Sequence, residues 1–286
     1  MQFDMSNLGT EQKLAAGSLT TKPSLDAHVL PIFCLEQVTD GKMDKLLTIS
    51  YEGKLCIRNK ESISEVERSE VFQFKKERAG TTDDSETIAI APTISCVFGR
   101  IGGSNYRLYV ATHDNLIQEY VIENLFVDQE EPRKNRTIHA HEAPICSLSM
   151  KGNPNNPDLD GMLISGSFDF SIALSVPQKY TEVIHKMHYH EDYVTGVDWN
   201  TEHPALFASC DCSGKLCLWN LLEDKDYPVY ITKREPISMV KWHPDGLRLI
   251  ISLLNGDVEI WKLKKKWLTV IEEELVEFEK FMVGSK

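Results

Sequence analysis

A unit of strand, tight turn and strand recurs along this chain, and the recurrence limits the folds that the chain can adopt. Its clearest copy is the run HPALFASCDCSGKLCLWNL at residues 203–221. The turn Ser213-Gly214 supplies a glycine, which accepts a positive φ without a steric penalty. After the turn, residues 215–219 alternate between two faces, and both faces are apolar toward the aromatic end at Trp219. This pattern is typical of a largely buried strand.

Five copies of the unit align on the second position of the turn. These positions are Gly53, Asn115, Phe170, Gly214 and Gly256. The last two separations are 44 residues (170 to 214) and 42 residues (214 to 256), which match the period of about 40–45 residues of a propeller blade. The wider early separations need insertions, and polar stretches at 61–86, 127–136 and 151–161 supply them. The repeat therefore predicts an all-β propeller with five recognisable blades.

Residues 1–27 contain no complete copy of the unit. The run MQFDM fits the last strand of one, with Phe3-Asp4 at the position that Trp219-Asn220 holds in the clearest copy. We therefore predict that residues 1–27 form the last strand of a preceding blade and a linker, and that residues 28–263 form the blades.

The C-terminal segment, residues 264–286, has a different pattern. Apolar residues recur at helical spacing on one face, and glutamates cover the other. The apolar positions are Trp267, Ile271, Leu275, Phe278 and Met282. Lys264–Lys266 precede this stripe, at the end where a helix dipole disfavours cations, so we expect them in a linker. We predict an amphipathic α-helix that packs against the blades, with a partner-binding helix as the alternative.

The composition argues against several classes of function. The formal net charge is -12, whereas a mainly electrostatic nucleic-acid binder needs a basic surface. No run approaches the roughly 20 apolar residues of a membrane span, and the N-terminus lacks the pattern of a signal peptide. The seven cysteines are irregularly spaced, which argues against a secreted disulfide scaffold. We therefore expect a cytoplasmic protein that binds neither nucleic acid nor membrane.

Two clusters contain residue types that bind metal ions. They are residues 185–192, with His185, His188, His190, Glu191 and Asp192, and residues 210–217, with Cys210, Cys212 and Cys217. Neither cluster has the ligand spacing of a four-cysteine site or of a site with two cysteines and two histidines. Strand alternation places Cys210 and Cys212 on one face, which favours packing in a core. We predict no metal ion and no cofactor.

The repeats resemble those of WD-repeat proteins, because Trp219-Asn220 stands where such a repeat carries its Trp-Asp pair. Four runs narrow the resemblance, in the right order, to the dynein intermediate chains. They are LLTISYEGKLCIRN, LISGSFDFSIALSV, the run from EDYVTGVDW through HPALFASCDCSGKLCLWNLLEDKDYPV, and WKLKKKWLTVIEEEL. The run HPALFA is similar to the cytoplasmic branch of that family. The resemblance implies an incomplete seven-blade propeller that lacks the family's first blades and its long N-terminal region.

The family resemblance also bears on a possible catalytic triad. His141, Asp169 and Ser167 are the residue types of a hydrolytic triad, but WD repeats use a histidine, a turn aspartate and a serine as a structural network. Residues 139–141 and 188–190 stand where the family places its Gly-His pair. The chain has no G-x-S-x-G elbow and no G-x-x-x-x-G-K-[ST] phosphate loop. We predict that the protein is not an enzyme and takes no small-molecule substrate.

The resemblance implies a scaffold subunit of a microtubule-associated cytoplasmic dynein complex, which binds the dynein heavy chain and other dynein subunits. Binding of light chains and dynactin is not carried over, because the family uses its N-terminal region for it. The alternatives are a WD-repeat adaptor unrelated to motors, or an enzyme or nucleic-acid module built on the same platform.

The loops that lead into the first strand of each blade are expected to lie on one rim. We take their polar and aromatic residues as candidate partner-binding residues: His141, Glu142, Glu191, Asp192, Tyr193, Arg234 and Glu235. The alternative, which the sequence favours, is that they are ordinary solvated loop residues.

Overall fold

The computed structural model describes residues 28–39, 44–59, 68–70, 93–102, 105–122, 133–152 and 159–284. These residues form five antiparallel sheets, a short 3-10 helix and one α-helix, in two compact units that divide between Ala91 and Pro92. The predicted strand at Phe3-Asp4 and the linker after it lie outside the described residues.

The first unit contains one sheet of four strands in chain order. They are β1 (Ile32–Thr39), β2 (Asp44–Ser50), β3 (Leu55–Asn59) and β4 (Arg68–Glu70). Leu47, Leu55 and Ile57 are fully buried. The apolar strands that the sequence predicts around Gly53 are therefore present.

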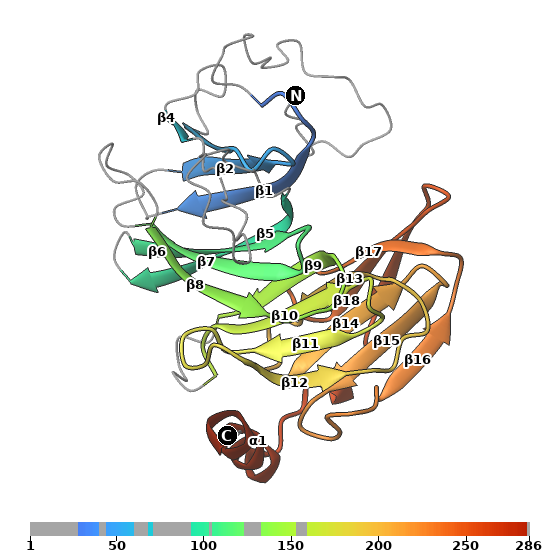
Figure 1. The fold of residues 1–286 in the computed structure, drawn as a ribbon. Helices are drawn as coiled ribbons and strands as arrows, with labels where there is room; N and C mark the ends of the chain where they lie inside the picture. The colour runs from blue at the N-terminus through green and yellow to red at the C-terminus, as the bar shows by residue number, and fades with distance from the viewer. Residues whose placement is uncertain are drawn as a thin grey trace. The chain divides into compact units, whose positions relative to one another are not determined.

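The second unit contains four sheets, each a meander of strands in chain order (Figure 1). The first two sheets consist of β5 (Thr93–Gly102), β6 (Asn105–Thr112), β7 (Leu116–Ile122) and β8 (Arg133–His139), and of β9 (Ile145–Lys151), β10 (Met162–Ser167), β11 (Ile172–Ser175) and β12 (Val183–Met187). The next two consist of β13 (Val194–Trp199), β14 (Leu206–Asp211), β15 (Lys215–Asn220) and β16 (Tyr230–Lys233), and of β17 (Ile237–Trp242), β18 (Arg248–Leu253) and β19 (Val258–Lys262). The first strands β5, β9, β13 and β17 contact one another in succession, as the inner strands of propeller blades do. The all-β blade architecture is confirmed.

All five predicted turns have the same backbone conformation at their second position. The φ angles are 71° at Gly53, 67° at Asn115, 64° at Phe170, 86° at Gly214 and 95° at Gly256. All five lie in the left-handed region, which glycine and asparagine adopt most readily. The alignment of the five copies on this position is therefore confirmed.

Alternate residues of β14 and β15 face two different hydrophobic cores. Cys210, Leu216 and Leu218 belong to the core shared with β17 and β18. Phe207 and Trp219 belong to the core shared with β10, β11 and the C-terminal helix, and their rings stack with centroids 5.6 Å apart. Burial of one such side chain contributes about 1.5–3 kcal/mol. The two apolar faces predicted for this strand pair thus hold neighbouring blades together.

The C-terminal segment forms η1 (Lys265–Leu268) and then α1 (Glu272–Gly284). The α-helix begins later than the apolar periodicity suggests, because the backbone is extended at Thr269 (φ -77°, ψ 125°). Glu272–Glu274 occupy its first turn, where the helix dipole favours acidic residues. Phe278 and Met282 are buried in the core of the second unit, so the helix packs on its own blades. No helix in the described ranges is long and apolar enough to cross a membrane.

Candidate interaction surface at the blade turns

Each blade of the second unit from β9 onward brings two loops together at one end. The leading loops are residues 140–144, 188–193 and 234–236, and the hairpin turns are residues 168–171, 212–214 and 254–257. In every case the residue after the second strand donates its N–H to the carbonyl that precedes the first strand. The pairs are Phe168 to Pro144 (3.0 Å), Cys212 to Tyr193 (3.0 Å) and Leu254 to Pro236 (2.8 Å). The candidate residues of the leading loops therefore lie beside the turns.

A four-residue network fixes this geometry in the blade of β13–β16. Trp219 Nε1 donates to Ser209 Oγ at 2.8 Å, and Ser209 Oγ lies 2.7 Å from His190 Nε2. His190 Nδ1 lies 2.7 Å from Asp211 Oδ2. Since Trp219 can only donate, the serine hydroxyl proton is left for Nε2, and Nδ1–H points to the aspartate. His190 and Asp211 side chains are fully buried, so this network is closed to any substrate.

The carboxylate of Asp211 connects the network to the turn. It accepts the N–H groups of Ser213 and Lys215 at 3.0 and 2.9 Å. Burial acts to raise the pKa of Asp211, but the hydrogen bonds from His190 and Ser213 outweigh it, so the pKa lies below its ordinary value. An ionised aspartate therefore anchors both the histidine and the turn.

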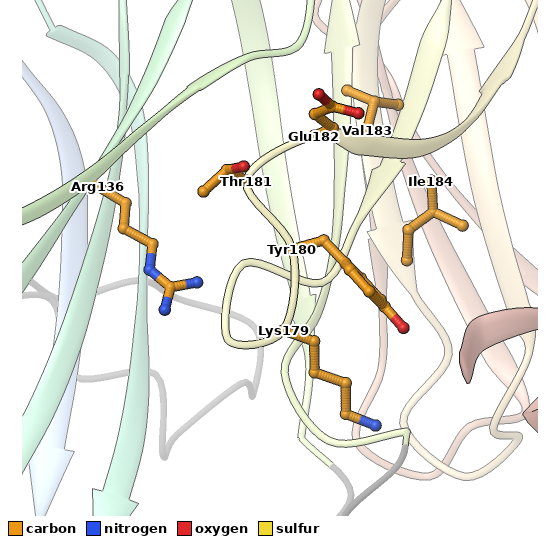
Figure 2. Close-up of a pocket in the computed structure, with 7 residues that line it drawn as sticks. All are labelled: Arg136, Lys179, Tyr180, Thr181, Glu182, Val183 and Ile184. Atoms are coloured by element: carbon orange, nitrogen blue, oxygen red, sulfur yellow. The ribbon is translucent and has the colours of Figure 1, made fainter. Parts of the chain in front are cut away.

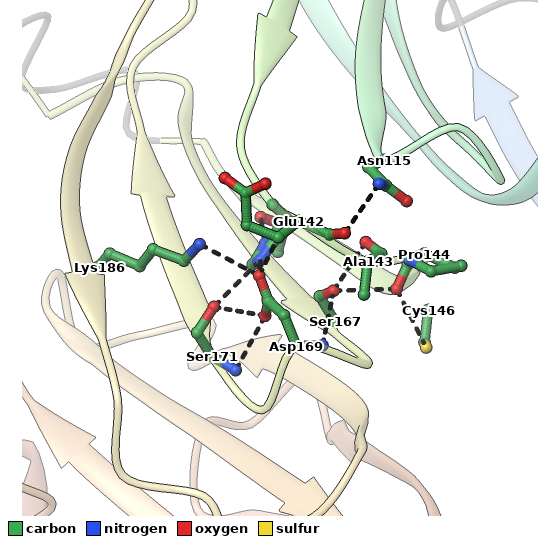
Figure 3. Close-up of polar contacts among 11 residues, drawn as sticks. Asn115, Glu142, Ala143, Pro144, Cys146, Ser167, Asp169, Ser171 and Lys186 are labelled. Carbon is green, nitrogen blue, oxygen red and sulfur yellow. Dashed lines mark hydrogen bonds and ion pairs between the residues drawn. The ribbon is translucent and has the colours of Figure 1, made fainter.

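The preceding blade has a similar network with a different serine, and Figure 3 shows the hydrogen bonds that Asp169 and Ser167 make in its turn. His141 Nδ1 lies 3.0 Å from Asp169 Oδ2, and His141 Nε2 lies 2.8 Å from Ser165 Oγ. The sequence interpretation assigned this role to Ser167, which was wrong. Ser167 Oγ instead donates to the carbonyl of Ala143 at 2.9 Å. Ser165 and Ser167 are both buried, and the geometry of the leading loop selects the one that faces the histidine.

The seven candidate partner-binding residues divide by exposure. His141 is buried in the network just described, so its side chain is not presented to a partner. The exposed ones are Glu142, Glu191, Tyr193, Arg234 and Glu235, and Asp192 is half-buried and accepts the N–H of Tyr193 at 2.8 Å. Arg234 stacks on the ring of Trp261 at 4.8 Å.

The structure adds two aromatic residues, Phe168 and Phe170, that the sequence interpretation did not count among the candidate partner-binding residues. The ring of Tyr193 lies 4.6 Å from that of Phe168 and 5.5 Å from that of Phe170, between centroids. The three rings, which we call the aromatic cluster, are 40%, 41% and 45% exposed at Phe168, Phe170 and Tyr193. Phe170 holds φ at 64°, a conformation that costs a residue with a Cβ about 1–2 kcal/mol. The sequence did contain a signal for this residue, because a phenylalanine stands at the turn position that holds glycine in three of the other copies.

One groove lies between β8 and the loop that joins β11 to β12 (Figure 2). It has a volume of about 480 Å³ and is lined by Arg136, Lys179, Tyr180, Thr181, Glu182, Val183 and Ile184. Arg136 is engaged at the groove wall, because its Nη1 donates to the carbonyl of Pro177 at 2.6 Å. The lining contains no histidine, cysteine or serine.

The two clusters considered as metal sites are dispersed by the fold. His190 is held in its network, and His185 Nε2 lies 3.1 Å from the carbonyl of Lys225. Cys210 and Cys217 face different cores, and burial raises the pKa of each thiol to about 12. Thiols with a raised pKa stay protonated at neutral pH. Among the described residues, no three histidine, cysteine or carboxylate side chains form a group that could hold a metal ion.

Comparison with known proteins supports the resemblance inferred from the repeats. The WD40 family model (WD domain, G-beta repeat) matches residues 181–220, which include β13 to β15 and all four residues of the network around Trp219. The cytoplasmic dynein 1 intermediate chain of Drosophila melanogaster is 28% identical over 244 residues. That alignment covers 84% of this chain and 34% of the relative, so the chain spans about a third of the relative's length. The WD repeat and the similarity to a dynein intermediate chain are thus confirmed.

Proposed function

We propose that this protein is a non-catalytic scaffold subunit of a cytoplasmic dynein complex that binds the dynein heavy chain through its blades. The observation that carries the proposal is the similarity to a dynein intermediate chain, which extends over 84% of the chain rather than over one repeat. Association with other dynein subunits and a microtubule-associated location in the cytoplasm follow from the same proposal.

The chemistry of the blades supports a scaffold rather than an enzyme. The histidine, aspartate and serine groups at the turns hydrogen-bond to one another and are buried, as at His190, Asp211 and Ser209. Side chains that are hydrogen-bonded to one another and buried hold the loops in place and are not accessible to a substrate. A rigid set of blades that presents fixed loops is suited to binding another protein.

Affinity purification of the tagged full chain from dynein-containing cells tests the proposal. We expect the dynein heavy chain among the recovered proteins at an amount comparable to the bait, and absent with the tag alone. Recovery of a defined complex without heavy chain contradicts the motor assignment and favours a WD-repeat adaptor of a different complex. Catalytic turnover by the purified chain contradicts the scaffold assignment.

A further inference from the structure

We propose that the aromatic cluster is a docking surface for a basic, apolar segment of a protein partner. The inference concerns the surface and the chemistry of the segment, and it holds whether the partner is a dynein subunit or another protein. It rests on three observations: the exposure of the rings, the backbone at Phe170, and the charges around them.

The three exposed rings form one group that is built from two separate loops. Phe168 and Phe170 come from the turn between β10 and β11, whereas Tyr193 comes from the leading loop of the next blade. Two adjacent blades therefore build one aromatic surface. Exposed aromatic groups that are held rigid lose little conformational freedom on binding, and aromatic residues are enriched among the residues that dominate binding energy.

The backbone conformation at Phe170 indicates that the phenylalanine serves binding and does not stabilise the fold. The equivalent turn position holds glycine in three of the other blades and asparagine in one, all with a positive φ. Phenylalanine is a poor residue for this conformation, and with 41% of its surface exposed it recovers little by burial. Strained residues of this kind cluster at binding sites.

The acidic side chains near the aromatic cluster favour a basic partner. Four carboxylates lie in these loops, at Glu142, Asp169, Glu191 and Asp192. Lys186 Nζ is 3.1 Å from Asp169, and Lys215 Nζ is 3.4 Å from Glu191, so both nearby lysines are already paired.

Two acidic groups remain for a partner. Among the described residues, Glu142 and Asp192 have no salt bridge, and Figure 3 shows the Glu142 carboxylate turned away from the hydrogen bonds around Asp169. A lysine or arginine beside an apolar side chain satisfies these carboxylates and also stacks on the ring faces.

Selection of a random displayed peptide library against the full chain tests this inference. We expect enriched peptides to combine Lys or Arg with apolar residues, and to bind Phe170→Gly at least about tenfold more weakly than the wild type. Phe170→Gly should fold as well as the wild type, because glycine fits the turn conformation. The matched control is Tyr227→Ala, which removes a 63% exposed aromatic side chain from another loop, and it should bind unchanged.

A charge exchange gives the second readout. Glu142→Arg should weaken the basic peptides, and the same peptides with glutamate in place of arginine should then regain binding. Enrichment of acidic peptides, no enrichment, or equal binding to Phe170→Gly overturns the inference. A wild-type dimer that Phe170→Gly disperses also overturns it, because a second copy then covers the surface. If heavy chain co-purifies equally with wild type and Phe170→Gly, the docking surface is refuted while the proposed function stands.

Discussion

Ser209 is the residue on which the four-residue network depends most. Its hydroxyl accepts from Trp219 Nε1 at 2.8 Å and meets His190 Nε2 at 2.7 Å, and the side chain is fully buried. Ser209→Ala therefore leaves two buried polar groups without a partner and changes the volume of the side chain very little. Ser165→Ala is the matched variant, because Ser165 meets only His141 Nε2, at 2.8 Å, in an equally buried place.

The expected magnitudes follow from the number of groups that lose a partner. An unsatisfied buried donor or acceptor costs about 1–3 kcal/mol. Ser165→Ala should therefore lower the free energy of unfolding by about 1–3 kcal/mol, and Ser209→Ala by roughly twice as much. The blade of Ser165 has Ser175 where the other has Trp219, and this difference is the physical reason for the unequal costs.

Native-state hydrogen exchange measures the protection of the backbone amides in β10 and β14, and it can be compared between each variant and the wild type. We expect a loss of protection confined mainly to the blade that carries the substitution, and larger for Ser209→Ala. An equal loss in the two variants, or a cost below about 0.5 kcal/mol for Ser209→Ala, refutes the assignment of hydrogen bonds in the network.

Three further predictions concern the turn, a buried histidine and the helix. Gly214→Ala should lower the free energy of unfolding, measured by chemical denaturation, by more than about 2 kcal/mol, since its Cβ would lie 1.9 Å from the carbonyl oxygen of Arg234. Gly256→Ala, at φ 95° with open space around it, should lower it by only about 1 kcal/mol. Burial lowers the pKa of His203 to about 4, so between pH 4 and 6.5 the unfolded chain binds a proton that the folded chain does not. The free energy of unfolding should therefore fall by up to about 3 kcal/mol as the pH drops through that window. A His203→Asn variant whose stability has the same pH slope as the wild type contradicts this. Phe278→Ala should cost about 3–5 kcal/mol and release α1, measured by exchange of its amides, whereas Val276→Ala, at an exposed position, should have little effect.

The backbone of the blades could be predicted from the sequence because each turn carries its own local signal. A residue that accepts positive φ, placed between apolar strands, occurs at Gly53, Asn115, Gly214 and Gly256, and it fixes the alignment of the copies. The start of α1 was less predictable. Trp267 fits the helical period, but the extended backbone at Thr269 separates it from the helix.

The aromatic cluster could not be predicted in the same way. Phe168 and Tyr193 are separated by a strand pair and a loop, and they meet only because one blade's turn lies against the next blade's leading loop. The prediction that Ser167 belongs to the network of its blade was wrong for a related reason, because the network uses Ser165. Both lie in one strand, and the position of His141, set by another loop, decides which of them it meets.

The most direct test of the account is a binding measurement with purified components. The full chain is mixed with a purified cytoplasmic dynein heavy-chain tail, and the complex is analysed by size-exclusion chromatography with light scattering and by titration calorimetry. We predict a stoichiometric complex with a submicromolar Kd, comparable to a specific protein interface. Separate elution of the two folded proteins, with no heat of binding at micromolar concentrations, contradicts the central claim that this protein is a heavy-chain-binding scaffold.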